Sequence, residues 1–184
     1  MKRVLIIIIC IVSVILFSIG VASAVFMRKG VIDNYQYTKE QYSTVLSNLI
    51  NEYETITTGR TNEDYRKIVE KDFGCGFYIY SEKDIEKGYN GKCYAFIRLI
   101  QIDDKASGFN YLTSFAHEMI HLTEFIKDEQ YVAWKTFKYL YEHDDPEFHS
   151  FGVRMGIYVF YNFYPEEYNC TAQIIEYFVR KGAR

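Results

Sequence analysis

Phe115-Ala116-His117-Glu118-Met119-Ile120-His121 is the most informative stretch of this sequence. Two histidines four residues apart project from the same face of an α-helix, one turn apart, so both imidazoles can bind one metal ion. Glu118 follows the first histidine and can lean toward a water molecule on that metal and accept its proton. The stretch predicts a helix that carries a zinc site, with His117 and His121 as metal ligands and Glu118 as the catalytic base.

Apolar residues surround the motif at helical spacing, which predicts a buried helix over about 111–126. These residues are Leu112, Phe115, Ala116, Met119, Ile120 and Leu122. Burying the polar side chains of His117, Glu118 and His121 in an apolar helix costs free energy unless these groups have a partner. A metal ion is one such partner, and the alternative is a pair of core histidines with Glu118 in a salt bridge.

The region from about Cys93 to Leu140 resembles the zincin metallopeptidases, in particular the gluzincin type. In that family two helix histidines and a downstream glutamate bind zinc, and the glutamate of the motif is the catalytic base. The resemblance implies that His117 and His121 are zinc ligands and that Glu118 is the base. It also implies that the strand before the helix lines the cleft and pairs with an extended peptide substrate.

Three downstream glutamates are candidates for the third zinc ligand. Glu124 lies seven residues after His117, about 10 Å along a straight helix, which is too far to share one ion. Glu142 has a spacing close to that of thermolysin-like enzymes, but it would lie about 20 Å along the next helix. Glu129 stands at the start of that helix, level with the end of the first one, in a glutamate-then-alanine pattern found in small gluzincin-like families. We therefore predict Glu129, with Glu142 and Glu124 as alternatives.

A tetrahedral intermediate also needs a donor for its oxyanion, often histidine or tyrosine. The candidates in this sequence are Tyr131, His143, His149 and Tyr158. Because the chain contains 18 tyrosines, the sequence favours none of these residues over the others.

Residues 30–184 predict a zincin-like α+β domain that is mostly helical, with a small antiparallel sheet. Apolar periodicity predicts helices over about 41–57, 62–71, 111–126, 128–142 and 146–161, with a last helix from Pro165. Two aromatic runs, Cys75–Tyr80 and Cys93–Ile97, predict a hairpin whose second arm continues to residue 102. A disulfide between Cys75 and Cys93 and two buried free thiols are equally compatible with this pattern.

Val4 to Met27 contains no charged residue and predicts an N-terminal hydrophobic helix. Its 24 residues would extend about 36 Å as a helix, enough to cross a hydrocarbon core of about 30 Å. Residues 1–29 are therefore predicted to be a transmembrane anchor, or a signal peptide cleaved near Ala22-Ser23-Ala24. The predicted localisation is a single-pass membrane protein with an extracytoplasmic domain, or a secreted protein if the signal is cleaved.

Composition and charge exclude several classes of protein. A hydrophobic content of 49% and an aromatic content of 18% exclude a disordered or low-complexity chain. The net charge is −3, and because residues 1–29 contribute +4, residues 30–184 carry −7 and have no electrostatic reason to bind nucleic acid.

The sequence predicts a membrane-anchored or exported zinc-dependent metallopeptidase that acts on a peptide or protein substrate. An alternative is a membrane-tethered binding protein with a structural or vestigial zinc site. A further alternative is a non-peptidase hydrolase with the same metal chemistry.

Overall fold

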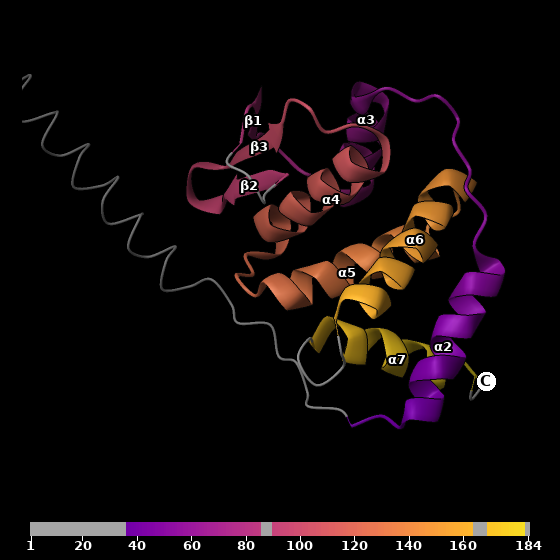
Figure 1. Ribbon diagram of the computed structural model, residues 1–184. Helices are drawn as coiled ribbons and strands as arrows, with labels where there is room; N and C mark the ends of the chain where they lie inside the picture. The colour runs from indigo at the N-terminus through magenta and orange to yellow at the C-terminus, as the bar shows by residue number, and fades with distance from the viewer. Residues whose placement is uncertain (1–35, 86–89, 164–168, 183–184) are drawn as a thin grey trace, which may run out of the picture.

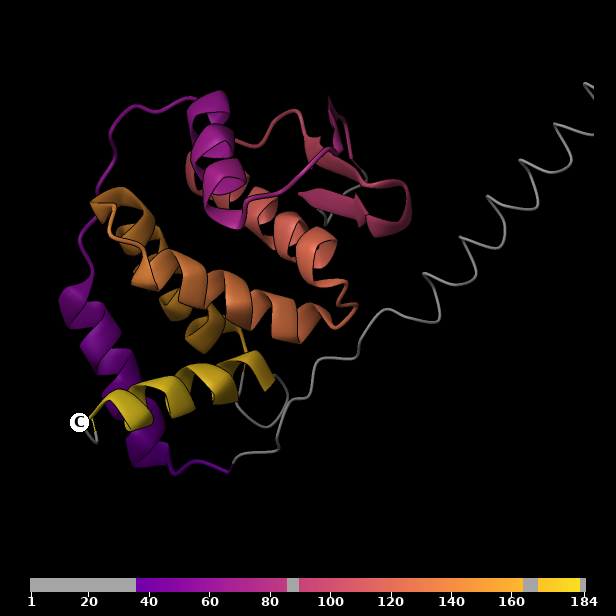
Figure 2. The same cartoon turned by 180° about the vertical axis from the view of Figure 1, so that it is seen from behind.

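The computed structural model of the protein describes residues 36–85, 90–163 and 169–182. This part of the chain is α+β, mostly helical with a small three-stranded sheet. In chain order the elements are α2 (Lys39–Glu52), α3 (Asn62–Phe73), β1 (Ile79–Lys83), β2 (Gly91–Tyr94), β3 (Leu99–Asp103), α4 (Gly108–Glu124), α5 (Glu129–Glu142), α6 (Pro146–Asn162) and α7 (Asn169–Gly182). Helix α4 lies between the sheet and α5, and α6 and α7 pack on α5 (Figure 1). The view from behind shows α3 beside α4 (Figure 2).

The helices predicted between residues 41 and 161 are confirmed by α2 to α6, with shifted ends. The largest shift is in α2, which is predicted to reach residue 57 but ends at Glu52. The residues that follow include Thr55-Ile56-Thr57-Thr58, and β-branched residues such as these have low helix propensity. Thr58 instead donates hydrogen bonds to Glu147 from its N–H and its hydroxyl, at 2.8 and 2.6 Å.

The sheet differs from the predicted antiparallel hairpin. Its strand order is β1–β3–β2, with β1 parallel to β3 and β2 antiparallel to β3. The predicted pairing of the Cys75 run with the Cys93 run is therefore wrong, because β3 lies between the two strands. The predicted continuous arm from Cys93 to residue 102 is also wrong, since a 3₁₀ turn over Ala95–Ile97 separates β2 from β3.

The conformation and contacts of Arg98 explain why β1 pairs with β3 and not with β2. It has a φ of 51°, in the left-handed region, and turns the chain back after the 3₁₀ turn. Its Nε donates to the carbonyl of Phe77 at 2.5 Å, and its own carbonyl accepts from the N–H of Ile79 at 2.7 Å. These two hydrogen bonds hold the start of β1 beside the start of β3, so the two strands run in parallel.

Two large apolar clusters and one small cluster form the core. The first is built mainly on the sheet, α3 and α4, and the second on α2, α5, α6 and α7. The small cluster joins the end of α4 to the start of α5 through Ile120, Ile126 and Val132. The apolar face of α4, which includes Phe115 and Met119, is fully buried in the first cluster. This packing fixes the rotation of α4 about its axis, so that His117 and His121 are turned toward the start of α5.

In the part of the chain that the structure describes, no helix could span a membrane. The longest described helices, α4 and α6, have 17 residues each, or about 26 Å of helix, against a hydrocarbon core of about 30 Å. This finding contradicts the predicted single-pass membrane localisation. The segment Val4–Met27, on which that prediction rested, lies outside the described residues, as does Pro165.

Candidate metal centre

A short turn between α4 and α5 determines where the predicted ligands lie. Phe125 follows α4 in the left-handed conformation, with a φ of 53°, and redirects the chain. Asp128 then caps α5, because its carboxylate accepts hydrogen bonds from two N–H groups in the first turn at 3.0 and 3.1 Å. Glu129 is therefore the first residue of α5, beside the last turns of α4 that carry His121.

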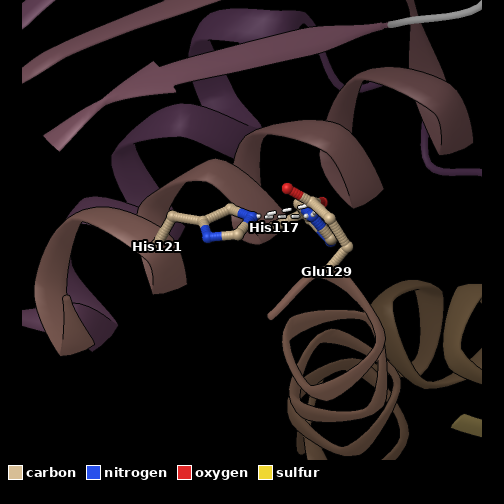
Figure 3. Close-up of side chains that lie close together, drawn as sticks. All are labelled: His117, His121 and Glu129. Carbon is tan, nitrogen blue, oxygen red and sulfur yellow. Dashed lines mark hydrogen bonds and ion pairs between the residues drawn. The ribbon is translucent and has the colours of Figure 1, made fainter. Parts of the chain in front are cut away.

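His117, His121 and Glu129 bring three ligand atoms together (Figure 3). Nε2 of His117 lies 3.0 Å from Oε2 of Glu129 and 3.1 Å from Nε2 of His121. The third separation, from Nε2 of His121 to Oε2 of Glu129, is 3.4 Å. In a tetrahedral zinc site the bond lengths separate neighbouring ligand atoms by about 3.3 Å. The three side chains therefore fit the geometry of a single zinc ion.

A backbone hydrogen bond determines which nitrogen of His121 can bind a metal. Nδ1 of His121 lies 2.6 Å from the carbonyl oxygen of Ile126. A carbonyl only accepts, so Nδ1 carries the proton and Nε2 of the neutral ring presents a lone pair. That lone pair would face the carboxylate of Glu129, which is also an acceptor, so a proton on Nε2 or a metal ion must lie between the two atoms. A carbonyl partner on the other nitrogen is typical of histidines that bind metals.

The charges of the cluster favour a cation. Hydrogen bonds from His117 and His121 hold the pKa of Glu129 far below its usual value, so its carboxylate is ionised. Burial lowers the pKa of His121, but Glu129 and the carbonyl of Ile126 raise it by more, and the pKa lies above its ordinary value. A cluster that attracts a proton in this way also attracts a metal ion, which competes for the same lone pairs.

Glu118 lies beside the cluster rather than within it. It is only 8% exposed, and it lines the same cleft as the two histidines. Burial raises the pKa of Glu118, although the imidazoles of His117 and His121 and the backbone N–H of Cys93 lower it in part. The carboxylate therefore lies in a largely enclosed position next to the two histidines.

A cleft of about 770 Å³ opens over the cluster. Residues 90–94 line one side of it, and α4 contributes the motif residues together with Thr113 and Ser114. Lys127 and Glu129, before and at the start of α5, and Met155 of α6 complete the lining. The site is thus open to a ligand much larger than a water molecule.

The free edge of β2 is directed toward this cleft. The N–H of Asp103 donates to the carbonyl of Asn90 at 2.9 Å, so these two residues form a hydrogen-bonded pair. Such pairs alternate with non-bonded pairs in an antiparallel ladder, so Gly91 and Cys93 direct their backbone groups away from β3. Among the described strands only β3 pairs with β2.

The other two candidates for the third ligand lie elsewhere. Glu124 forms an ion pair with Lys135 at 3.1 Å, and Glu142 accepts a hydrogen bond from Tyr177 at 2.8 Å. Neither glutamate lines the cleft. The structure therefore brings Glu129 to the histidines and leaves the two alternatives apart from them.

The predicted oxyanion donors are not brought to the cleft. The lining contains none of Tyr131, His143, His149 and Tyr158. Instead, His143 contacts Asp72 and His149 contacts Glu52, both at 2.9 Å.

Several residues that line the cleft were not predicted from the sequence. These are Asn90, Gly91, Lys92, Tyr94, Thr113, Ser114, Lys127 and Met155. For most of them the only signal in the sequence is position. Tyr94 belongs to the strand expected to border the site, residues 90–92 belong to the connection predicted just before that strand, and Lys127 stands two residues before Glu129.

The structure resolves the question of Cys75 and Cys93 in favour of free thiols. Sγ of Cys75 accepts a hydrogen bond from the guanidinium of Arg98 at 3.3 Å. Cys93 lines the cleft, and burial raises the pKa of its thiol to about 12. Because the thiolate is the form that binds metals, this protonated thiol is a poor ligand beside the histidine pair.

The fold and the site thus define a mostly helical α+β domain with a cluster of two histidines and a glutamate at a strand-bordered cleft. No protein-family model, curated protein or solved structure matches the chain. The geometry and chemistry of the cluster are therefore the basis for assigning a function.

Proposed function

We propose that this protein is a zinc-dependent metallopeptidase. The observation that carries the proposal is the convergence of His117, His121 and Glu129 at separations of 3.0–3.4 Å, with Glu118 in the same cleft. Two imidazoles and one carboxylate are a ligand set used by catalytic zinc sites, and they leave the fourth tetrahedral position open.

Each group of the motif has a distinct role in this proposal. Zinc at the site would supply Lewis acidity, which makes water reactive near neutral pH and polarises a substrate carbonyl. Glu118 accepts a proton from the attacking water and passes it to the leaving amine. The carbonyl of Ile126 keeps His121 in the required tautomer, and the carboxylate of Glu129 offsets part of the charge of the ion.

The edge of β2 supports a peptide as the substrate. Gly91 and Cys93 direct backbone groups toward the cleft, and an extended peptide can pair with such an edge through main-chain hydrogen bonds. This pairing would lay the peptide along the cleft above α4, close to Glu118. A substrate without a backbone of this kind would make no use of the strand edge.

We further propose that the elements around the site are arranged as in the zincins. The edge strand β2 comes before α4, which carries the motif, and α5 supplies the third ligand, in the same order as in the zincins. Glu129 follows His121 by eight residues, a shorter spacing than in thermolysin-like enzymes. The tight turn at Phe125 and the cap at Asp128 make this short spacing possible.

A binding protein with a structural zinc site has less support. Structural zinc sites are closed by four protein ligands. Among the residues that the structure describes, this cluster contains three, and it opens on a cleft of about 770 Å³.

The test is hydrolysis of an unfolded protein by the zinc-loaded full chain, with zinc content measured in parallel. We expect Glu118→Gln to keep its zinc and to lose about 10²- to 10⁴-fold in rate, because an amide cannot accept the proton. Glu124→Gln is the matched control, since Glu124 belongs to the same helix but pairs with Lys135 outside the cleft. A zinc-loaded wild type that hydrolyses nothing, or a fully active Glu118→Gln variant, would contradict the proposal.

A further inference from the structure

Gly91, the first residue of β2, lies closer to Glu118 than any other residue type would allow. A Cβ atom at Gly91 would lie 2.9 Å from both Cγ and Oε1 of Glu118, and 3.1 Å from Cδ1 of Ile102. Non-bonded carbon atoms are in favourable contact at about 3.5–4.0 Å. Even alanine would therefore force the side chain of Glu118 to move.

The backbone does not require a glycine at this position. Gly59, Gly74 and Gly108 have positive φ values, whereas Gly91 is not among the glycines that do. Glycine within a strand is less stable than other residues, and it often marks a close approach of another group. The space that Glu118 occupies is therefore the feature that accounts for glycine at position 91.

Strand β2 and Glu118 also border the same cleft. Cys93 lies two residues beyond Gly91 on this strand, and both residues line the cleft together with Glu118. The missing side chain at Gly91 lets the carboxylate of Glu118 lie against the strand.

We infer that Gly91 is a positioning residue for Glu118, an inference that rests on the proposed function for its effect on catalysis. The strand that would bind the peptide also lies against the carboxylate of Glu118, so β2 sets the base and the substrate relative to each other. A displacement of a reacting group by about 1 Å can lower a rate about 100-fold. A side chain at position 91 would therefore impair catalysis without touching the metal ligands.

Thermal unfolding tests the contact itself, independently of any activity. Gly91→Ala should lower the Tm of the full chain, and Glu118→Ala should remove most of that loss when the two changes are combined, because the clashing atoms are gone. Ile102→Val removes the other close atom, and combining it with Gly91→Ala should restore little of the lost Tm. Gly76→Ala is the matched control, since no atom lies within 4 Å of a Cβ there. Additive shifts in Tm for Gly91→Ala and Glu118→Ala would overturn the inference, and so would a failure of both Gly91→Ala and the double variant to fold.

Kinetics test the positioning role. In Gly91→Ala we expect an unchanged zinc content, a kcat lowered about 10- to 100-fold and a KM within about twofold of the wild type. Gly76→Ala should keep the wild-type values. An unchanged kcat, or a loss of zinc that equals the loss of rate, would refute this role. If the zinc-loaded wild type hydrolyses nothing, the proposed function fails, while the Tm comparison still decides whether Gly91 makes room for Glu118.

Discussion

Glu129 is the residue that completes the candidate site. His117 and His121 come together through the repeat of a single helix, whereas Glu129 must be brought to them by a second helix. Its carboxylate lies 3.0 and 3.4 Å from the two imidazole nitrogens, and its side chain is largely exposed at the edge of the cleft. It is therefore the proposed ligand that can be altered with the least disturbance of the core.

Replacing Glu129 with glutamine keeps its shape and removes its charge. We expect the zinc affinity of Glu129→Gln to fall at least about 100-fold, because an anionic ligand is lost, and the activity to return in part when zinc is added in excess. Competition with a chelator measures the affinity. Glu118→Gln serves as the comparison and should bind zinc as the wild type does. Equal zinc affinity in Glu129→Gln and the wild type would mean that Glu129 is not a ligand.

At the scale of residues, the sequence predicts side chains better than backbone groups. The four-residue spacing of His117 and His121 predicts their common face, and the length of the next helix favours Glu129 over Glu142. The role of the carbonyl of Ile126 could not be predicted, because every residue has such a group and only the tertiary structure selects among them.

At the scale of elements, the first turn of α5 positions Glu129, the proposed third ligand. Asp128 caps this helix, and the loss of an N-cap side chain lowers stability by about 1 kcal/mol. We expect Asp128→Ala to lower the free energy of unfolding by about this amount and also to weaken zinc binding, since Glu129 is the next residue. Asp128→Asn should keep both properties, because asparagine also caps helices.

Thr38 at the start of α2 offers a control for the cap of α5. It caps its own helix in the same manner, but α2 contributes nothing to the cleft. Thr38→Ala should lower the free energy of unfolding by about 1 kcal/mol and leave zinc affinity unchanged, as chemical denaturation and zinc titration can show. Equal changes in zinc affinity for Thr38→Ala and Asp128→Ala would argue against the role of the α5 cap.

Helices were predictable at this scale because their signals are local. Apolar periodicity and capping residues predicted the existence of α3 to α6, while the end of α2 depended on a partner 89 residues away, Glu147. The sheet was not predictable from the same signals. Ala95-Phe96-Ile97 is as apolar as a strand, and the left-handed turn at Arg98 has no mark in the sequence such as glycine.

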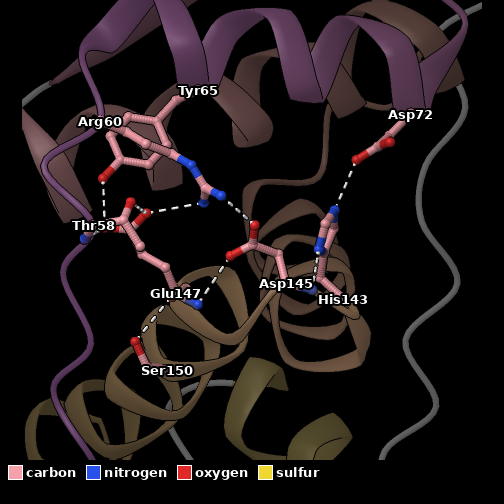
Figure 4. Close-up of polar contacts among 8 residues, drawn as sticks. All are labelled: Thr58, Arg60, Tyr65, Asp72, His143, Asp145, Glu147 and Ser150. Carbon is pink, nitrogen blue, oxygen red and sulfur yellow. Dashed lines mark hydrogen bonds and ion pairs between the residues drawn. The ribbon is translucent and has the colours of Figure 1, made fainter.

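At the scale of the whole molecule, a polar network connects α3, α6 and the segment between α2 and α3 (Figure 4). Glu147 is 1% exposed and accepts hydrogen bonds from Thr58, Arg60 and Tyr65. Arg60 also forms an ion pair with Asp145 at 2.6 Å. These residues do not line the cleft, so we assign the network to stability rather than to catalysis.

The network makes a pH-dependent contribution to stability. The hydrogen bond from Arg60 holds the pKa of Asp145 below its usual value, so ionised Asp145 stabilises the fold above about pH 4, and this stabilisation is lost as the pH falls through the lowered pKa. Asp145→Asn keeps the cap of α6 but loses the charge. We expect it to be less stable than the wild type by about 1 kcal/mol at pH 6, with a smaller difference below about pH 4. Urea unfolding at several pH values measures the difference, and a gap that does not change with pH would contradict this account.

The cleft forms only when the sheet, α4, α5 and α6 pack together, and the sequence contains little information about its lining. The expectation that a strand borders the motif helix came from a family resemblance, whereas the edge position of β2 and the contact of Gly91 with Glu118 depend on how the sheet packs on α4. Long-range packing of this kind leaves no local pattern. The prediction of oxyanion donors failed for the same reason, since none of the four candidate residues lies in the cleft.

His117, His121 and Glu129 are proposed to form one zinc site. The most direct measurement is the zinc content of the purified full chain after equilibration with zinc and removal of the unbound ion. We expect one zinc ion per chain, lost in the double variant His117→Ala and His121→Ala. His143→Ala should retain the ion, because His143 contacts Asp72 away from the cleft. A wild type without stoichiometric zinc, or a double variant that keeps it, would contradict the account.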